Sequence, residues 1–111
     1  MKNVIIINEQ HNLMEQQEEV IERQLGNDIE LLKIPAQGIN RQEIEDLANE
    51  LNNKAVNVIV LSPIPLLLAR LAHNQGINDV WILHNDRRDK IEINGQIRMV
   101  VAKDGWELIQ V

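Results

Sequence analysis

Polar residues that could do chemistry follow three apolar stretches of the chain. Asn8 and His11 follow the first stretch, Ser62 and Pro63 the second, and the polar run 84–88 the third. A serine hydroxyl beside a helix start and an arginine side chain can both hold a phosphate. Imidazole side chains can donate or accept protons near neutral pH. These residue types predict an anion-binding site with proton-transfer groups beside it.

The predicted anion site combines Ser62, just before an expected helix, with Arg87 or Arg88 as a bidentate clamp. A structural interpretation competes with this one. Loop ends in any α/β domain are polar, and the flanking Asp86 and Asp89 could simply pair with the two arginines. The sequence leaves both interpretations open.

The three histidines of the chain differ in where they fall. His11 and His84 lie at predicted strand ends, where they can serve as general acid and base or be ordinary surface residues. His73 falls in the last turn of the helix after Ser62, about 15 Å from the start of that helix by helical rise. Within one subunit His73 is therefore expected far from Ser62, at a helix end where the dipole favours a histidine.

Residues 4–7 form a short β-branched run without alternation, which is typical of a strand buried on both faces of a parallel sheet. The apolar stretches 56–61 and 80–83 and the segment 29–34, which ends at Pro35, are also predicted to be strands. Between them, apolar residues recur at helical spacing, and Asn12 with Glu15 and Asn40 with Glu43 have the spacing of a capping box. The predicted order is strand 4–7, helix 13–25, strand 29–34, a helix from the Asn40 cap through Leu51, strand 56–61, a helix from 66 to about 75, and strand 80–83. This alternation implies right-handed βαβ units. Residues 1–111 are thus predicted to form one Rossmann-like, three-layer α/β domain with a mainly parallel sheet.

The C-terminal segment is predicted to be an antiparallel β-meander. Its strands are 90–93, 96–102 and 106–111, with turns at 94–95 and 104–105. A two-residue first turn would set Ile93 opposite Gln96. We prefer a three-residue, bulged loop, which sets Ile93 opposite Ile97, because the apolar side chains then share one face.

Composition limits the classes of function. The 111 residues are 44% hydrophobic and 25% charged, as in a folded globular domain. A net charge of −6 argues against long nucleic acid but permits a small phosphorylated ligand. There is no cysteine, which excludes disulfides, thiolate nucleophiles and cysteine-ligated zinc and suits a cytoplasmic protein. No apolar run approaches the roughly 20 residues of a membrane span, so we expect neither export nor insertion.

From Val58 to Arg88 the chain resembles small CRISPR-associated Rossmann-fold (CARF-like) proteins, particularly the stand-alone ring nucleases that degrade cyclic oligoadenylate messengers. Three features carry the resemblance: a Val/Ile strand ending in Ser62, a proline-started helix ending at 71–73, and an apolar strand leading into a polar Asp/Arg stretch. The resemblance implies a role in antiviral defence. It also implies a homodimer in which the ligand can lie between subunits.

The resemblance further implies roles for single residues. Ser62 would belong to the ligand-binding turn, His73 would match the helix-end histidine, and Arg87 the arginine after the last strand. The acidic position of the family falls on Asn85 or Asp86, and the resemblance allows Mn²⁺ as the cofactor of a metal-assisted mechanism. The turn before the helix departs from the family pattern, since it has prolines where the family tends to have glycines.

Two functions follow as the main hypotheses. In the first, the protein binds and cleaves a cyclic oligoadenylate. Asn8, His11, Ser62, Pro63, Arg87 and Arg88 would bind the ligand, and His73, His84 and Asp86 would be catalytic. In the second, it is a non-enzymatic homodimeric interaction module built on the meander and on the helix 66–75, whose apolar sequence predicts the most buried helix or an interface helix. A generic nucleotide- or sugar-handling enzyme has only fold analogy behind it.

Overall fold

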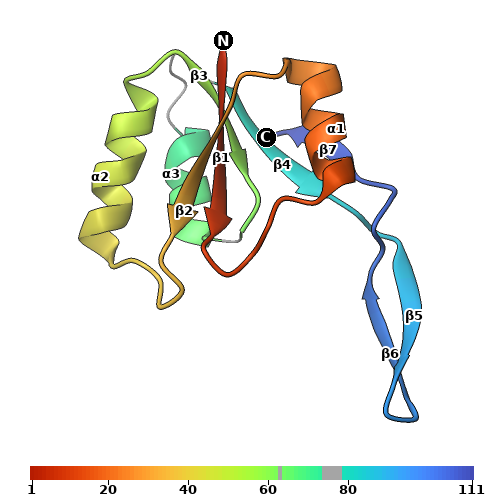
Figure 1. Ribbon diagram of the computed structural model, residues 1–111. Helices are drawn as coiled ribbons and strands as arrows, with labels where there is room; N and C mark the ends of the chain where they lie inside the picture. Colours follow the sequence, from red (N-terminus) through yellow and green to blue (C-terminus); the bar gives the residue numbers. More distant parts are fainter. Residues whose placement is uncertain (63, 74–78) are drawn as a thin grey trace.

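A computed structural model of the chain describes residues 1–62, 64–73 and 79–111. Within this part, strands and helices alternate as far as His84, and strands alone follow (Figure 1). The elements are β1 (Lys2–Asn8), α1 (Glu15–Leu25), β2 (Ile29–Ile34), α2 (Arg41–Asn52), β3 (Val56–Val60), α3 (Pro65–His73), β4 (Asp79–His84), β5 (Arg88–Ile93), β6 (Gln96–Val101) and β7 (Glu107–Gln110). The predicted alternation of strands and helices is therefore confirmed.

The main sheet has five strands in the order β2-β1-β3-β4-β7. Its first four strands run parallel, and β7 pairs antiparallel with β4. Every residue of β3 is buried, as are residues 3–7 of β1, because helices cover both faces of these central strands. Such strands need no alternation of apolar and polar residues. The prediction of a mixed α/β protein with a mainly parallel sheet is confirmed.

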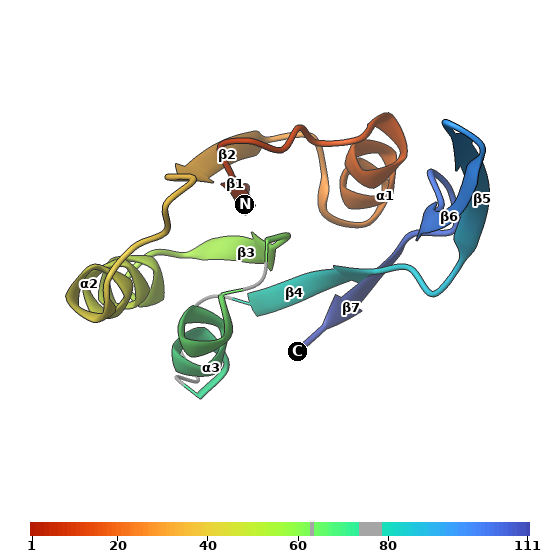
Figure 2. The ribbon, with the colours of Figure 1, turned by 90° about the horizontal axis from the view of Figure 1, so that it is seen from below.

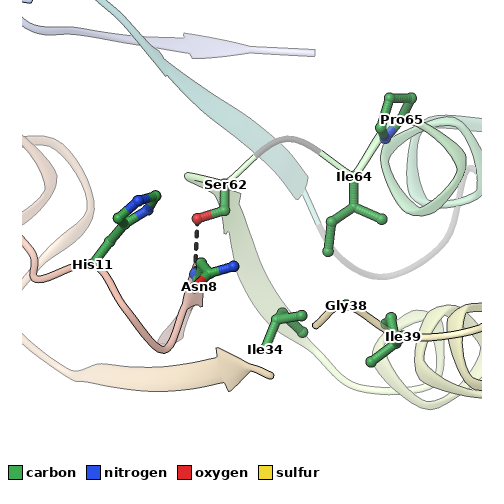
Figure 3. Close-up of a pocket in the computed structure, with 8 residues that line it drawn as sticks. All are labelled: Asn8, His11, Ile34, Gly38, Ile39, Ser62, Ile64 and Pro65. Atoms are coloured by element: carbon green, nitrogen blue, oxygen red, sulfur yellow. Dashed lines mark hydrogen bonds between the residues drawn. The ribbon is translucent and has the colours of Figure 1, made fainter. Parts of the chain in front are cut away.

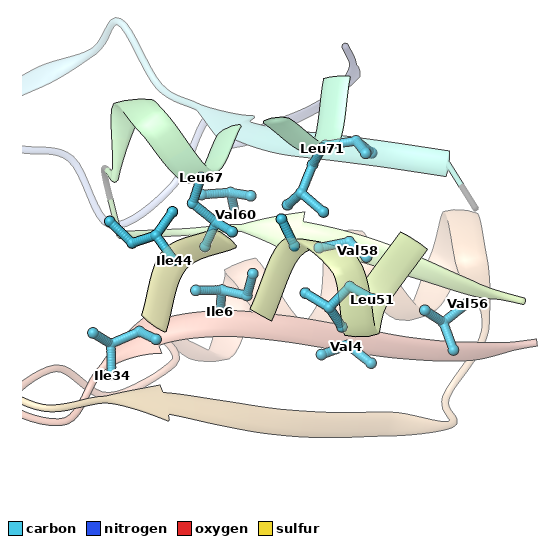
Figure 4. Packing of buried hydrophobic residues seen from close by; sticks show 12 residues of the cluster. Val4, Ile6, Ile34, Ile44, Leu51, Val56, Val58, Val60, Leu67 and Leu71 are labelled. Atoms are coloured by element: carbon cyan, nitrogen blue, oxygen red, sulfur yellow. The ribbon is translucent and has the colours of Figure 1, made fainter. Parts of the chain in front are cut away.

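The helices divide between the two faces of the sheet, α1 on one face and α2 with α3 on the other (Figure 2). Alternate residues of the central strands therefore enter two different cores. On the α1 side, Ile5 and Ile59 pack with Val20 and Ile21. The core on the α2 and α3 side is the larger one (Figure 4) and contains Val4, Ile6, Ile44, Leu51, Val58, Val60, Leu67 and Leu71. Burying each large aliphatic side chain contributes about 1.5–3 kcal/mol to the free energy of folding, relative to leaving it exposed. The two cores therefore stabilise the central strands from both faces.

The two predicted capping boxes have different outcomes. Asn40 caps α2: its Oδ1 accepts the Glu43 backbone N–H at 2.8 Å, and Glu43 Oε1 accepts the Asn40 N–H at 3.1 Å. The predicted start of α1 at residue 13, with an Asn12 cap, is wrong. The helix begins at Glu15, and the buried Gln17 side chain accepts the backbone N–H of Met14 at 2.9 Å. Residue 13 packs against the α1-side core and lies outside the helix. The first capped N–H is therefore that of Met14, and Gln17 accepts it.

The predicted meander is wrong in its pairing. Strand β7 leaves the hairpin and pairs with β4 in the main sheet, where Leu108 opposite Leu83 becomes buried. Strands β5 and β6 form a separate two-stranded sheet. Burial of apolar surface beside β4 explains this choice, since the hairpin offers β7 no covered face.

The preferred bulged turn is also wrong. Ile93 lies opposite Gln96, and both turn residues have positive φ, 52° at Asn94 and 79° at Gly95. A two-residue turn of this kind matches the right-handed twist of the strands. Agreement of the apolar faces does not decide the register here, because all β5 side chains are exposed and neither face of the hairpin is a core.

Helix α3 starts at Pro65, one residue before the predicted range, and so begins with the expected proline. It is not the most buried helix, since Leu67 and Leu71 are its buried residues while α1 and α2 each bury three. The predicted extension of this helix to about residue 75 and the predicted site residue Pro63 lie outside the described residues. Within the described part of the chain, no helix is long and apolar enough to span a membrane.

Candidate functional site

The candidate site lies at the carboxyl ends of β1 and β3. These adjacent strands mark the point where the strand order reverses, because β2 lies on one side of β1 while β3 and β4 lie on the other. The helices that follow β1 and β3, α1 and α3, lie on opposite faces of the sheet (Figure 2). Ligands of open α/β sheets bind in the crevice that opens at such a point.

A hydrogen bond joins the two strand ends. The backbone N–H of Asn8 donates to Ser62 Oγ at 2.7 Å, and Ser62 is 8% exposed (Figure 3). The chain turns sharply after β1, since Asn8 Oδ1 accepts the N–H of Gln10 at 2.9 Å and its carbonyl accepts that of His11 at 2.9 Å. Because the Ser62 oxygen accepts a hydrogen bond here, its own O–H proton can be donated to a ligand.

A cavity of about 420 Å³ opens beside this hydrogen bond. Its polar wall consists of Asn8, His11 and Ser62 (Figure 3). The remaining wall comes from the end of β2, the loop before α2 and the start of α3, and is formed by Ile34, Gly38, Ile39, Ile64 and Pro65. Small-molecule sites commonly have volumes of about 300–1,000 Å³ and mostly apolar walls with a few polar groups. The cavity thus suits a ligand with a flat or apolar body and a polar group facing Ser62.

A second hollow, of about 350 Å³, lies next to the first. His11 and Ser62 line both, so they separate the two spaces. The second hollow is otherwise mostly apolar, with Met14, Leu61, Leu83, Val101 and Trp106 in its wall. Together the two spaces can accommodate a ligand with more than one unit.

The structure does not bring the two predicted arginines to Ser62. Arg87 lies at the base of the hairpin with its Nη1 3.3 Å from Asp104 Oδ1. Arg88 Nη1 donates to the carbonyl oxygens of Asn85 at 2.9 Å and of Arg87 at 3.0 Å. Neither arginine lines either of the two hollows. The ion-pair interpretation fits Arg87, with Asp104 in place of the flanking aspartates, whereas Arg88 binds backbone carbonyls.

The structure separates His73 from the other two predicted catalytic residues, His84 and Asp86. His84 ends β4 and is exposed opposite Glu107, and Asp86 is exposed in the loop that follows. His73 ends α3, the helix whose first residues line the cavity, so the length of the helix separates it from Ser62. His11 is the histidine that lines the cavity.

Asn85 has a structural role that its sequence position does not reveal. It is 7% exposed, and its Nδ2 donates to the carbonyl oxygens of Ala102 at 3.0 Å and Asp104 at 2.8 Å. Its Oδ1 accepts the N–H of Arg87 at 2.9 Å. The amide thus ties the two ends of the hairpin together and has little capacity left for a ligand.

The described residues do not fit a Mn²⁺ ion. No group of three or more His, Asp or Glu side chains among them could hold a metal. One of the two candidates for the family's acidic position, Asn85, is occupied by hydrogen bonds of the hairpin base. We therefore derive no metal-assisted step.

The residues missed by sequence reasoning are the apolar ones. Ile34, Gly38, Ile39 and Ile64 line the cavity, yet none has a side chain that suggests chemistry. Their shared signal is position, because they end β2, form the loop before α2 and precede α3. Once strand order is known, loops at that edge can be expected to contribute.

Comparison of the chain with family models, curated proteins and solved structures finds no match. The resemblance of residues 58–88 to CARF-like proteins therefore rests on those residues alone. Arguments about function accordingly depend on the cavity and its surroundings.

Proposed function

We propose that the protein binds a small phosphorylated ligand of nucleotide type at the β1/β3 cavity, with cyclic oligoadenylate as the first candidate. The observation that carries this proposal is the buried Ser62, whose hydroxyl accepts the Asn8 N–H at 2.7 Å and which lines a cavity at the start of α3. A helix start has free backbone N–H groups and a partial positive charge that favour phosphate. The strand order β2-β1-β3-β4 matches the start of the flavodoxin-like doubly wound order, whose sheets can bind a nucleotide cofactor between β1 and β3.

The cavity walls suit the parts of a nucleotide. Ile34, Ile39 and Ile64 offer an apolar surface to a base, while Ser62 offers a hydroxyl proton to a phosphate or ribose oxygen. The second hollow across His11 and Ser62 provides space for an adjoining nucleotide. Because the arginines are engaged elsewhere, binding should depend only weakly on salt.

Cleavage of such a ligand would require a proton acceptor at the cavity. The ribose 2′-hydroxyl would attack the adjacent phosphorus, and the 5′-oxygen would leave and take up a proton from water. The products would be a 2′,3′-cyclic phosphate and a 5′-hydroxyl. His11 is the residue that we assign to accept the 2′-hydroxyl proton, since it lines both hollows. We propose the cytoplasm and antiviral signalling as the setting.

Calorimetric titration with cyclic tetra-adenylate and cyclic hexa-adenylate tests the proposal. Wild-type protein should bind at least one of them, and Ser62→Ala should weaken binding about tenfold, since one hydrogen bond to a charged group is lost. Arg87→Gln is the matched control and should leave affinity nearly unchanged. Chromatography of the same mixtures, with and without Mn²⁺, reports any linear product. A wild-type protein that binds neither ligand would overturn the proposal.

A homodimeric interaction module is the second candidate function. The specific observation in its favour is the exposure of large apolar side chains along the β5–β6 hairpin. Such patches commonly mark protein interfaces. Light scattering at high micromolar concentration tests it, and a monomer would contradict it.

A further inference from the structure

The β5–β6 hairpin carries its apolar side chains into solvent. It forms its own sheet and extends away from the helices and the main sheet (Figure 1). The exposed fractions are 37% for Ile91, 46% for Ile93, 72% for Ile97 and 56% for Met99. An isolated two-stranded hairpin is marginally stable in water, and independent stability needs three or more strands. Within the described part of the chain, no third strand joins it.

The register of the hairpin decides which backbone groups face outward. Its two-residue turn at 94–95 pairs Ile93 with Gln96, and such turns are closed by a hydrogen bond between their first and last residues. Hydrogen-bonded pairs then alternate along an antiparallel ladder. The N–H of Ala102 donates to the carbonyl of Arg87 at 3.1 Å. This bond fits an alternation in which the odd-numbered residues of the first strand of the hairpin bond to β6. The even-numbered residues of β5 therefore direct their backbone N–H and C=O groups to its outer edge.

The outer edge of β5 is accessible. In both ribbon views β6 lies between β5 and the rest of the molecule (Figures 1 and 2). An unpaired strand edge is a template for another strand. In a twofold-symmetric dimer the same surface meets itself, so the strand that would pair with β5 is β5 of a second copy.

Charge complementarity selects one register for this pairing. Outward-facing groups must meet outward-facing groups, so even-numbered residues must lie opposite even-numbered residues. Registers that set Glu92 opposite itself, or Arg88 opposite Lys90, place like charges directly opposite and form no opposite-charge pair within β5. The register with Lys90 opposite itself forms two Arg88–Glu92 pairs but places the two lysines directly opposite each other. With Ile91 opposite Ile91, Lys90 of each chain lies opposite Glu92 of the other. This register has two opposite-charge pairs and no pair of like charges directly opposite.

We infer that the outer edge of β5 is a self-association surface, where a second copy of the chain pairs its β5 antiparallel with Ile91 opposite Ile91. The inference rests on the interaction-module function and is independent of ligand binding. The two hairpins then form one four-stranded sheet, which meets the strand number that a stable sheet needs. On one face of this sheet, Met99 lies beside Lys90 of the same copy. Lys90 in turn lies beside Glu92 of the second copy, and that Glu92 lies beside Ile97 of the second copy. The other face brings the two Ile91 side chains together.

Charge exchange across this edge tests the inference in the full-length protein. Lys90→Glu and Glu92→Lys each set two like-charge pairs opposite one another and should raise the dimer dissociation constant about tenfold or more. Mixing the two variants in equal amounts restores both opposite-charge pairs, so a heterodimer of near wild-type affinity should form. Lys33→Glu, which makes the same charge change on the edge strand β2, is the matched control and should leave the dimer intact.

Sedimentation over a concentration series measures all four proteins and the mixture. Rescue in the mixture supports the inference and also shows that both variants are folded. A wild-type protein that stays monomeric would overturn the interaction-module function together with the inference. A dimer that neither charge change weakens would overturn the inference alone, because that dimer would use another surface.

Discussion

At the residue scale, two polar side chains fix the chain where loops leave the sheet. The Ser62 hydroxyl accepts the Asn8 N–H at 2.7 Å and holds the ends of β1 and β3 together. Asn85 makes three hydrogen bonds that close the base of the hairpin. The two side chains differ in their remaining hydrogen-bonding capacity. Ser62 still has its hydroxyl proton to donate to a ligand, whereas Asn85 has little capacity left for one.

Replacing Asn85 with the isosteric Asp tests its structural role. The substitution exchanges the donating amide for an oxygen that faces two carbonyl oxygens in a buried site. Stability measured by urea denaturation should fall by about 2 kcal/mol or more. Amide exchange at Ala102, whose N–H donates to Arg87, should accelerate. Asp86→Asn, at the exposed neighbouring position, is the control, and equal stability of the two variants would refute the assignment.

At the element scale, helix starts and the hairpin register show what local sequence can predict. Asn40 and Glu43 form the predicted box, in which the side chain of each accepts the backbone N–H of the other. Asn12 has the same spacing to Glu15, but the helix begins later because residue 13 is part of a core and Gln17 accepts the Met14 N–H. Spacing alone therefore predicts a cap only where tertiary packing does not compete with it.

The two asparagines provide a paired test. Asn40→Ala removes the side-chain acceptor of the Glu43 N–H and should reduce the free energy of unfolding by about 1 kcal/mol. Asn12→Ala should change it little, because Asn12 does not cap α1. Chemical denaturation of both variants measures the difference. A comparable loss for Asn12→Ala would show that the helix starts at the earlier position.

At the scale of the whole molecule, the two sheets are joined but separate. The apolar runs predicted the parallel strands well, because a strand buried on both faces of a sheet has a nearly continuous apolar sequence. It could not predict that β7 returns to β4, since that choice depends on the distant Leu83 that Leu108 meets. The candidate cavity was predictable at Asn8, His11 and Ser62. Its apolar wall required the strand order.

Replacing residues 88–101 by a two-residue Asn-Gly turn tests the separation of the sheets. Arg87 and Ala102 already form a hydrogen-bonded pair at 3.1 Å, so they can flank such a turn directly. The shortened protein should unfold cooperatively with a free energy within about 1 kcal/mol of wild type, because the hairpin adds little independent stability. Circular dichroism during urea denaturation measures this, and a loss of cooperative unfolding would show that the main sheet depends on the hairpin.

The central claim is that Ser62 and Asn8 mark a ligand site between β1 and β3, and a nuclear magnetic resonance titration tests it most directly. With labelled protein and cyclic tetra-adenylate or cyclic hexa-adenylate, backbone shifts should concentrate at Asn8, His11, Ile39, Ser62 and Ile64. The same shifts should shrink in Ser62→Ala at equal ligand concentration. An unchanged spectrum with both ligands, or shifts confined to the hairpin base around Arg87, would contradict the account.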